Sequence, residues 1–364
     1  MTNGYCLRFF VLWALSIIFM LGLGGCLGES GSGKSIIDLY VEAVILKELD
    51  QKDQAISKLD EAVRKDATFS LAYSLQGDLY QQKGEYEKSA EFYEKAAVLN
   101  PWSFYDFFNL GRVYEAMKRF TDAVRAYVRA CEIDPNHLQA HINTARCFKE
   151  IEDYEQALIY GQRAEQLNPN VVEIQEILGG IYESKGDHAQ AIRSFKRALE
   201  LDSGNTRVMT SLAVAYLRAE QPQFARELLE NVVKIDSENA DAYRHLGYCY
   251  LRLYEQSAQI HSDAVAAGNT DQTYLDSLTS TAKNMIEASI NNYLKAISID
   301  QSDWDAHRGL GVAYMISGRT ADNDIEPELK EKSLFHWRTS LQINPDQPRA
   351  DRLRRLIAQY RMRQ

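Results

Sequence analysis

The sequence predicts an all-α protein, a solenoid of about eight helix–turn–helix repeats. Two series of small residues support this prediction, because successive members of each series lie 34 residues apart. The first series is Ala43, Gly77, Gly111, Ala145, Gly179, Ala213 and Gly247. The second series is Ala55, Ser89, Ala123, Ala157, Ala191 and Ala225. A repeat of this length cannot bury its apolar face alone, so neighbouring repeats must stack to form a continuous core.

The third repeat shows how the pattern encodes two helices. Its first half places residues at i, i+3, i+4 and i+7, the spacing of one helix face, with Phe107, Leu110, Gly111 and Tyr114. Its second half continues with Ala123, Tyr127 and Ala130. Asp134 and Pro135 then end the unit, because proline cannot continue a helix.

This period and residue pattern resemble the tetratricopeptide repeat. The resemblance implies a right-handed α-solenoid over residues 36–347, with regular repeats at 36–69, 70–103, 104–137, 138–171, 172–205 and 206–239, followed by two interrupted ones. Residues 348–364 are predicted to form a C-terminal capping helix, with Leu353, Leu356, Ile357 and Tyr360 on one face. A terminal repeat needs such a cap with a polar outer face.

Two insertions interrupt the last repeats. In the seventh repeat, the second helix, with Ser289, Tyr293 and Ala296, begins 30 residues late. Because apolar residues keep helical spacing on both sides of Gly268, residues 251–288 are predicted to form a protruding helical hairpin. In the eighth repeat, the excess at 319–328 is predicted to be a loop.

The N-terminal segment predicts attachment to a membrane. Residues 1–25 read as a signal peptide, with Arg8 followed by an uncharged run from Phe9 to Gly25. The ending Leu-Gly-Gly-Cys resembles the lipobox of bacterial lipoproteins, which implies that Cys26 becomes the acylated N-terminus and 26–35 a flexible tether. The protein would then face the periplasm from the cell membrane or outer membrane. The alternative is a single N-terminal transmembrane anchor, since the 17-residue run is near the lower limit for a bilayer span.

Composition excludes nucleic acid as a general partner. The formal net charge is −10, and no concentrated basic arm supplies phosphate contacts. The final helix is an exception, with Arg349, Arg352, Arg354, Arg355, Arg361 and Arg363. It is interpreted as a solvated cap, and contact with anionic headgroups or an acidic partner is the alternative.

Two motif matches are interpreted as structural. Residues 28–35 satisfy the phosphate-binding pattern G-x-x-x-x-G-K-[ST], but no preceding strand or metal-binding acid accompanies them, so no nucleotide is expected. Cys131, His137, His141 and Cys147 have residue types of a zinc site without a zinc spacing, so no metal or other cofactor is expected. Cys131, Cys147 and Cys249 are interpreted as buried free thiols, and a bridge between the first two is the alternative.

Candidate site residues come from the resemblance. In this family, fixed positions on the first helix of each repeat line a concave groove that receives a peptide or a partner helix. Those positions are occupied here by Tyr105, Phe108, Arg112, Gln139, Ile142, Arg146, Lys149, Arg207, Arg244, Tyr248 and Arg308, with Glu115, Glu173, Glu176 and Glu183 among them. A solvated face that balances charge is the alternative interpretation. Ser74 and Asp78 stand where the chaperone-binding members of the family have Lys and Asn, so no chaperone tail is predicted.

The sequence therefore predicts a membrane-anchored scaffold that binds a protein or peptide partner in the bacterial cell envelope, in assembly of a pilus, secretion or outer-membrane complex. The alternative is a non-catalytic subunit that regulates or recruits an envelope glycosyltransferase or peptidase. No catalytic constellation stands out, so the protein is not expected to be an enzyme.

Overall fold

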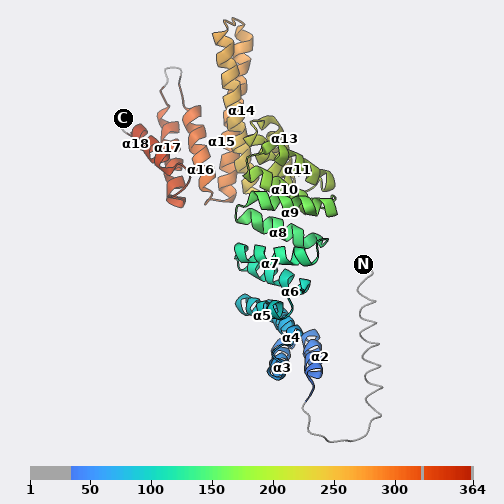
Figure 1. Ribbon diagram of the computed structural model, residues 1–364. Coiled ribbons are helices and arrows are strands. Elements are labelled where there is room, and N and C mark those ends of the chain that lie inside the picture. The colour runs from blue at the N-terminus through green and yellow to red at the C-terminus, as the bar shows by residue number, and fades with distance from the viewer. Residues whose placement is uncertain (1–33, 321–323, 362–364) are drawn as a thin grey trace, which may run out of the picture. The chain divides into compact units, whose positions relative to one another are not determined.

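A computed structural model describes residues 34–320 and 324–361, and this part of the chain is helical throughout, with a single isolated β-bridge between Arg319 and Ile325 (Figure 1). Its helices are α2 (Ile36–Glu48), α3 (Lys52–Lys65), α4 (Ser70–Gln82), α5 (Tyr86–Leu99), α6 (Phe104–Ala116), α7 (Phe120–Ile133), α8 (Leu138–Glu150), α9 (Tyr154–Leu167), α10 (Val172–Ser184), α11 (His188–Leu201), α12 (Thr206–Arg218), α13 (Pro222–Ile235), α14 (Ala240–Ala266), α15 (Gln272–Ile299), α16 (Trp304–Ser317), α17 (Pro327–Ile343) and α18 (Ala350–Arg361). The predicted all-α repeat solenoid is confirmed. The predicted signal peptide and Cys26 lie outside the described residues.

The described chain divides into two compact units. The first ends at Pro101 and contains α2 to α5, and the second begins at Trp102 and contains α6 to α18. Within each unit the even-numbered helix of a repeat packs against the odd-numbered helix that follows it, and that helix packs against the next repeat. The sequence predicts one continuous array over 36–347, whereas the packing forms two units.

In the first six repeats, the turn between the two helices depends on one residue with a left-handed backbone. Positive φ angles recur at the 34-residue period, at Asp50, Gly84, Lys118, Glu152, Gly186 and Glu220. Glycine adopts this conformation without a Cβ penalty, and it occupies two of the six positions. The same conformation at Gly268, with a φ of 76°, turns the chain between α14 and α15.

The side chains of the two helices of a repeat are complementary in size where the helices cross. Where the first helix has glycine, the second helix places an aromatic ring over it, as in the pairs Gly77–Tyr93, Gly111–Tyr127, Gly179–Phe195, Gly247–Tyr293 and Gly311–Trp337. A Cβ on any of these glycines would lie between 2.3 and 2.9 Å from the nearest ring atom. Where the first helix has alanine, the residue 16 positions later is smaller, in the pairs Ala43–Leu59, Ala145–Gly161 and Ala213–Leu229. The aromatic side chains therefore fill space within a repeat.

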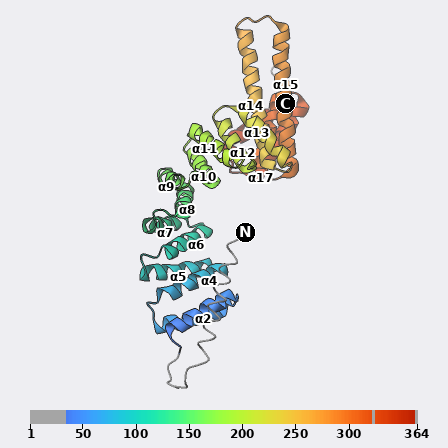
Figure 2. The same ribbon diagram turned by 90° about the vertical axis from the view of Figure 1, so that its right-hand side faces the viewer.

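The seventh repeat carries a long hairpin. Its helices α14 and α15 have 27 and 28 residues, about four turns more than the 13 and 14 residues of an ordinary repeat. Both views show the hairpin extending past the neighbouring helices (Figures 1 and 2). The Ser289 hydroxyl donates to the Gly247 carbonyl oxygen at 2.7 Å, as Ser89 donates to Gly77 at 2.8 Å, so the repeat register resumes after the insertion. None of the helices in the described segments combines the length and apolar character needed to cross a membrane.

The C-terminal helix covers the last repeat. Leu353 of α18 is buried with Met315, Leu334 and Trp337, and Tyr360 lies 6.4 Å from the Trp337 ring. The apolar face of α18 therefore packs against the last repeat, and most of the arginines of this helix are exposed.

Candidate partner-binding groove

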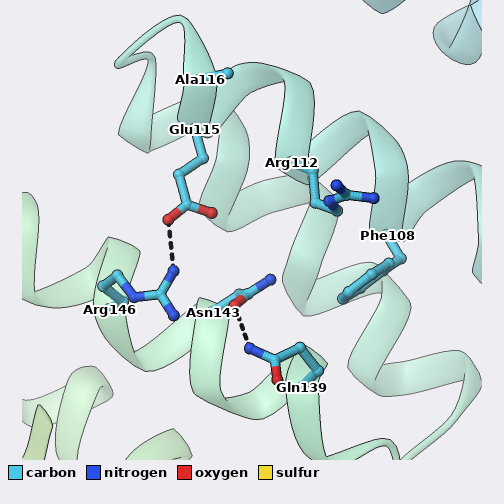
Figure 3. Close-up of a pocket in the computed structure, with 7 residues that line it drawn as sticks. All are labelled: Phe108, Arg112, Glu115, Ala116, Gln139, Asn143 and Arg146. Carbon is cyan, nitrogen blue, oxygen red and sulfur yellow. Dashed lines mark hydrogen bonds and ion pairs between the residues drawn. The ribbon is translucent and has the colours of Figure 1, made fainter. Parts of the chain in front are cut away.

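The first helices of repeats three to six place two hollows next to each other in the second unit. The first hollow, between α6 and α8, has a volume of about 530 Å³ and is lined by Phe108, Arg112, Glu115, Ala116, Gln139, Asn143 and Arg146 (Figure 3). The second, of about 510 Å³, is lined by Arg146, Lys149, Glu150, Val172, Glu173, Glu176, Ile177, Asp202, Asn205 and Arg207. Arg146 belongs to both hollows, so it marks the boundary between them.

One wall of the first hollow is aromatic. Phe108 stacks on Phe104 at 5.4 Å between ring centroids, and its ring also lies 5.8 Å from Tyr127 and 5.2 Å from His137. Phe108 is half-buried, so part of its ring faces the hollow. Tyr105, one turn earlier on α6, is 49% exposed.

The opposite wall is a hydrogen-bonded network around Glu115. Arg146 donates to one carboxylate oxygen of Glu115 at 2.8 Å, and the Tyr127 hydroxyl donates to the other at 2.8 Å. Asn143 donates to the Tyr127 oxygen at 3.2 Å and accepts from Gln139 at 3.0 Å. Burial, together with the Glu115 charge, raises the pKa of Tyr127, so its proton stays in place. Both Glu115 oxygens are therefore engaged inside the fold.

Most of the predicted groove arginines are paired with carboxylates of the same unit. Arg146 also pairs with Glu173, and Arg207 pairs with Glu176. Arg244 lies 3.0 Å from Asp303 and 2.6 Å from Asp241. Arg308 pairs with Asp305 at 2.5 Å and stacks over Trp304 at 5.1 Å. Carboxylates from the same or neighbouring repeats therefore neutralise these four arginines, as in the alternative interpretation of a face that balances charge.

Arg112 is different. Its guanidinium donates to the Asn109 side chain at 3.2 Å, and within the described ranges it forms no ion pair. The Arg112 residue is exposed, and it lies between Phe108 and Glu115 at the edge of the first hollow (Figure 3). The groove thus presents one guanidinium without a carboxylate beside an aromatic wall.

The structure corrects one predicted groove residue. Ile142 is only 2% exposed and packs in a core cluster with Ala164, Ile174 and Leu178. The next repeat covers this position, so Ile142 stabilises the stack and is inaccessible to a partner. Gln139 and Lys149 do line the hollows, whereas Arg244, Tyr248 and Arg308 lie on α14 and α16, outside both of them.

Sequence reasoning missed the amides of the groove. Asn109 and Asn143 occupy the same repeat position, 34 residues apart, where the second repeat has the buried Leu75. Both are buried, and each hydrogen bonds to a groove side chain. A polar residue recurring at an otherwise apolar position was a signal available in the sequence.

Within the described residues, the side chains of the phosphate-binding pattern and of the possible zinc site make contacts that stabilise the fold. Ser35 caps α2, accepting from the Asp38 amide at 3.1 Å while its own amide donates to the Asp38 carboxylate, and Lys34 pairs with Glu42. Residues 28–33 of the phosphate-binding pattern lie outside the described residues. His137 caps α8, and the Nε2 of His141 lies 3.0 Å from the Pro135 carbonyl oxygen.

The three cysteines of the described chain are buried free thiols, as predicted. The Cys249 thiol donates to the Pro222 carbonyl oxygen at 3.0 Å. Burial raises the pKa of Cys147 and of Cys249 to about 12, so both stay protonated. In the parts of the chain that are described, no group of three or more His, Cys, Asp or Glu side chains is placed to hold a metal ion.

Comparisons with known proteins agree with the fold. Family models described as tetratricopeptide repeat match residues 70–101 and 104–137, 183–230 and 210–270, and one described as TPR repeat matches 280–318. Together these matches cover more than half of the chain. No curated protein matches it in sequence.

Solved structures show the same architecture. A chain of the APC/C hetero-tetramer Cut9–Hcn1 matches with a TM-score of 0.52 and 16% identity, over 88% of this chain and 55% of that one. A tetratricopeptide repeat protein from Parabacteroides merdae matches with a TM-score of 0.49 and 15% identity, over 77% and 99%. YrrB, described as a TPR protein with an unusual peptide-binding site, matches with a TM-score of 0.46 and 22% identity, over 50% and 95%. The chain is a member of the tetratricopeptide repeat family, an all-α scaffold for protein–protein interaction.

Proposed function

We propose that this protein is a membrane-anchored scaffold whose groove in repeats three to six binds an extended or helical segment of a partner protein. One observation carries this proposal: Arg112 is an exposed guanidinium with no carboxylate partner in the described chain, next to the half-buried ring of Phe108. A carboxylate on the partner satisfies such a guanidinium through charge-assisted hydrogen bonds, and an apolar side chain beside it packs on the ring. The preferred segment therefore carries an acidic residue next to an apolar one.

The surrounding network supports a rigid site. The Glu115 carboxylate is held by Arg146 and Tyr127, so the wall opposite Phe108 is fixed before a partner arrives. A site that is already ordered loses less conformational entropy on binding. Gln139 is exposed at the rim, where its amide is accessible to the backbone of an extended segment.

Attachment to a membrane is part of the proposal. The lipobox-like sequence ending in Cys26 supports a lipid anchor, and several acyl chains at about 0.8 kcal/mol per buried CH₂ make such a tether stable. An anchored scaffold of this kind serves to hold the components of an envelope assembly such as a pilus, a secretion system or an outer-membrane complex.

Co-purification from solubilised membranes tests the groove. The wild-type chain, Arg112→Glu and the control Arg125→Glu are compared by quantitative mass spectrometry of the proteins they retain. Arg125 is exposed on α7, outside both hollows, and pairs with Asp122 at 3.4 Å. The partner should be lost from Arg112→Glu and kept by Arg125→Glu, because the reversed charge repels its carboxylate. Equal retention by the two variants would show that the partner binds elsewhere.

Replacement of the cysteine tests the anchor. Cys26→Ala should abolish labelling by a fatty-acid analogue and leave the precursor uncut, still held by its apolar segment. A variant that is cut at the normal position would rule out lipidation at Cys26.

A further inference from the structure

The eighth repeat has two histidines where other repeats have an aromatic contact. In the second repeat, Tyr73 of α4 stacks on Phe92 of α5, with ring centroids 6.3 Å apart. His307 of α16 and His336 of α17 stand at these two places. In the part of the chain that the structure describes, no other repeat has histidine at both. A contact that does not titrate is therefore replaced by one that can.

A hydrogen bond between the two imidazole rings joins α16 to α17. Nδ1 of His307 lies 2.8 Å from Nδ1 of His336, and the ring centroids are 5.0 Å apart. One of these nitrogens must donate and the other must accept. Because a cationic imidazole carries a proton on both of its nitrogens, at most one ring can be charged while the hydrogen bond lasts.

The pair is enclosed by apolar and aromatic groups. His307 is 5% exposed, and His336 is half-buried. The His336 ring lies 5.8 Å from Tyr314 and 5.1 Å from Phe335, between ring centroids. Each ring is therefore sheltered from the water that would solvate a positive charge.

The charged side chains around the pair are already engaged with one another. These ion pairs are Asp303 with Arg244 of α14, Arg308 with Asp305, Lys332 with Glu328, and Arg354 of α18 with Asp351. Asp303 favours a charged His307, but the His307 ring opposes a charge on His336. On α15, burial raises the pKa of the Tyr293 hydroxyl, so it stays neutral.

Burial lowers the pKa of both histidines, to about 4 for His336. If α17 left α16, the two rings would regain the ordinary pKa of about 6.5. The opened repeat therefore binds more protons than the closed one between pH 4 and 6.5. Opening must become easier as the pH falls through this window.

The contacts of α17 determine what such an opening would uncover. Three hydrogen bonds tie this helix to the backbone of α16, from Ser333 to Gly311 at 2.6 Å, from Ser340 to Trp304 at 2.7 Å and from Trp337 to Arg308 at 3.3 Å. Leu353 of α18 is buried in one cluster with Trp337. Movement of α17 would therefore carry α18 with it and expose the Trp337 ring.

We propose that the contact between His307 and His336 is an acid-sensitive closure, which holds α17 and α18 on α16 at neutral pH and releases them as the pH falls to about 5. Release would uncover the apolar cluster of Met315, Leu334 and Trp337 as new surface. The device lies on α16 and α17, outside both hollows, and does not depend on the groove proposal.

Hydrogen exchange followed by mass spectrometry tests the proposal. The full-length chain in phosphatidylcholine nanodiscs is compared at pH 7 and pH 5, and each exchange rate is divided by the intrinsic rate at the same pH. The opening constants of α17 and α18 should rise about 20-fold or more between these pH values, as the pKa of His336 requires. Those of α10, which carries no histidine, should change by less than about threefold, because distant repeats open separately.

Three variants identify the groups that respond. His307→Tyr with His336→Phe recreates the Tyr73–Phe92 contact of the second repeat and should abolish the rise in α17 and α18. His336→Gln keeps a neutral hydrogen-bonding side chain without enlarging it, and should lose most of the rise. His245→Gln is the matched control, since burial also lowers the pKa of His245 to about 4 but this residue lies on α14. It should leave the rise in α17 and α18 unchanged.

Three results would overturn the proposal. The first is an equal opening constant of α17 at pH 5 and pH 7. The second is a rise of the same factor in α10, which would mean that the whole unit responds to acid. The third is a wild-type rise in His336→Gln, or its loss in His245→Gln, because either result would assign the response to another group.

Discussion

Replacing Gly179 by alanine tests the size matching between the two helices of a repeat. A Cβ at this position would lie 2.6 Å from Cε1 of Phe195, and three atoms of that ring lie within 2.8 Å of it. Phe195 is itself only 5% exposed, so its ring cannot move into solvent without uncovering the core around Ala191 and Ala198.

The magnitude follows from two opposing effects. Overpacking a core by one methyl group costs about 1 to 3 kcal/mol. Alanine is favoured over glycine in a helix by about 1 kcal/mol. We therefore expect Gly179→Ala to lower the free energy of unfolding by up to about 2 kcal/mol. Phe195→Leu alone should cost about 1 kcal/mol through the cavity it leaves.

The double variant should behave differently from the sum of the single ones. Gly179→Ala with Phe195→Leu recreates the pair Ala213–Leu229 of the next repeat, in which both residues are 0% exposed. The new methyl group then fills the space that the ring vacates. A double-mutant cycle should give a favourable coupling of about 1.5 kcal/mol or more.

Urea unfolding followed by circular dichroism measures these differences, and Gly180→Ala is the control. Gly180 is the adjacent residue of α10, but its Cβ would meet only the flexible Lys149 side chain, at 3.3 Å. This control should be neutral or more stable by up to about 1 kcal/mol. Equal midpoints for Gly179→Ala and Gly180→Ala, or strict additivity in the cycle, would refute the size-matching argument.

Three further predictions concern buried polar groups and a helix cap. Burial lowers the pKa of His245 and of His336 to about 4, so the unfolded state binds more protons between pH 4 and 6.5 and stability must fall as the pH falls through that window. Urea unfolding at pH 7 and at pH 5 measures this effect, and His245 alone should lower the free energy of unfolding by about 2 kcal/mol at the lower pH. The His245→Gln variant should show a smaller dependence of stability on pH. Tyr127→Phe removes the hydroxyl that joins the buried Asn143 amide to the Glu115 carboxylate, and in the same assay it should lower the free energy of unfolding by about 1 to 2 kcal/mol. An unchanged free energy of unfolding would show that this network does not stabilise the fold. Ser35→Ala should cost α2 about 1 kcal/mol and increase amide hydrogen exchange in its first turn, whereas unchanged exchange would show that the cap is dispensable.

The fold could be predicted from the sequence because the same residue pattern occurs in every repeat. A small residue, either glycine or alanine, recurs at one place in the first helix of each repeat, and the helix registers of Gly111 and Tyr127 follow from local spacing alone. Even the interrupted seventh repeat keeps its register, since Ser289 reaches the same kind of carbonyl as Ser89. An ambiguous position in one repeat can be assigned from the equivalent positions of the other repeats, and a domain without repeats offers no such comparison.

The groove could not be predicted to the same extent, because its chemistry depends on contacts between repeats. The position rule that selected Phe108 and Gln139 also selected Ile142, and only the packing of α10 shows that this side chain is covered. A helix position fixes the direction of a side chain, but the next repeat decides whether it is exposed. Similarly, the sequence places arginines along the groove without showing which carboxylates reach them.

Pairing between repeats determines which groove charges are available to a partner. Glu115 and Arg146 are 31 residues apart, as are Glu176 and Arg207, so each pair joins the first helices of two successive repeats. An arginine held in this way stabilises the stack, and reversing its charge would place a third carboxylate beside Glu115 and Glu173. A binding defect in an Arg146→Glu variant would therefore mix a structural effect with a functional one. Arg112 has no such partner in the described chain, so a change at this residue alone reports on the partner.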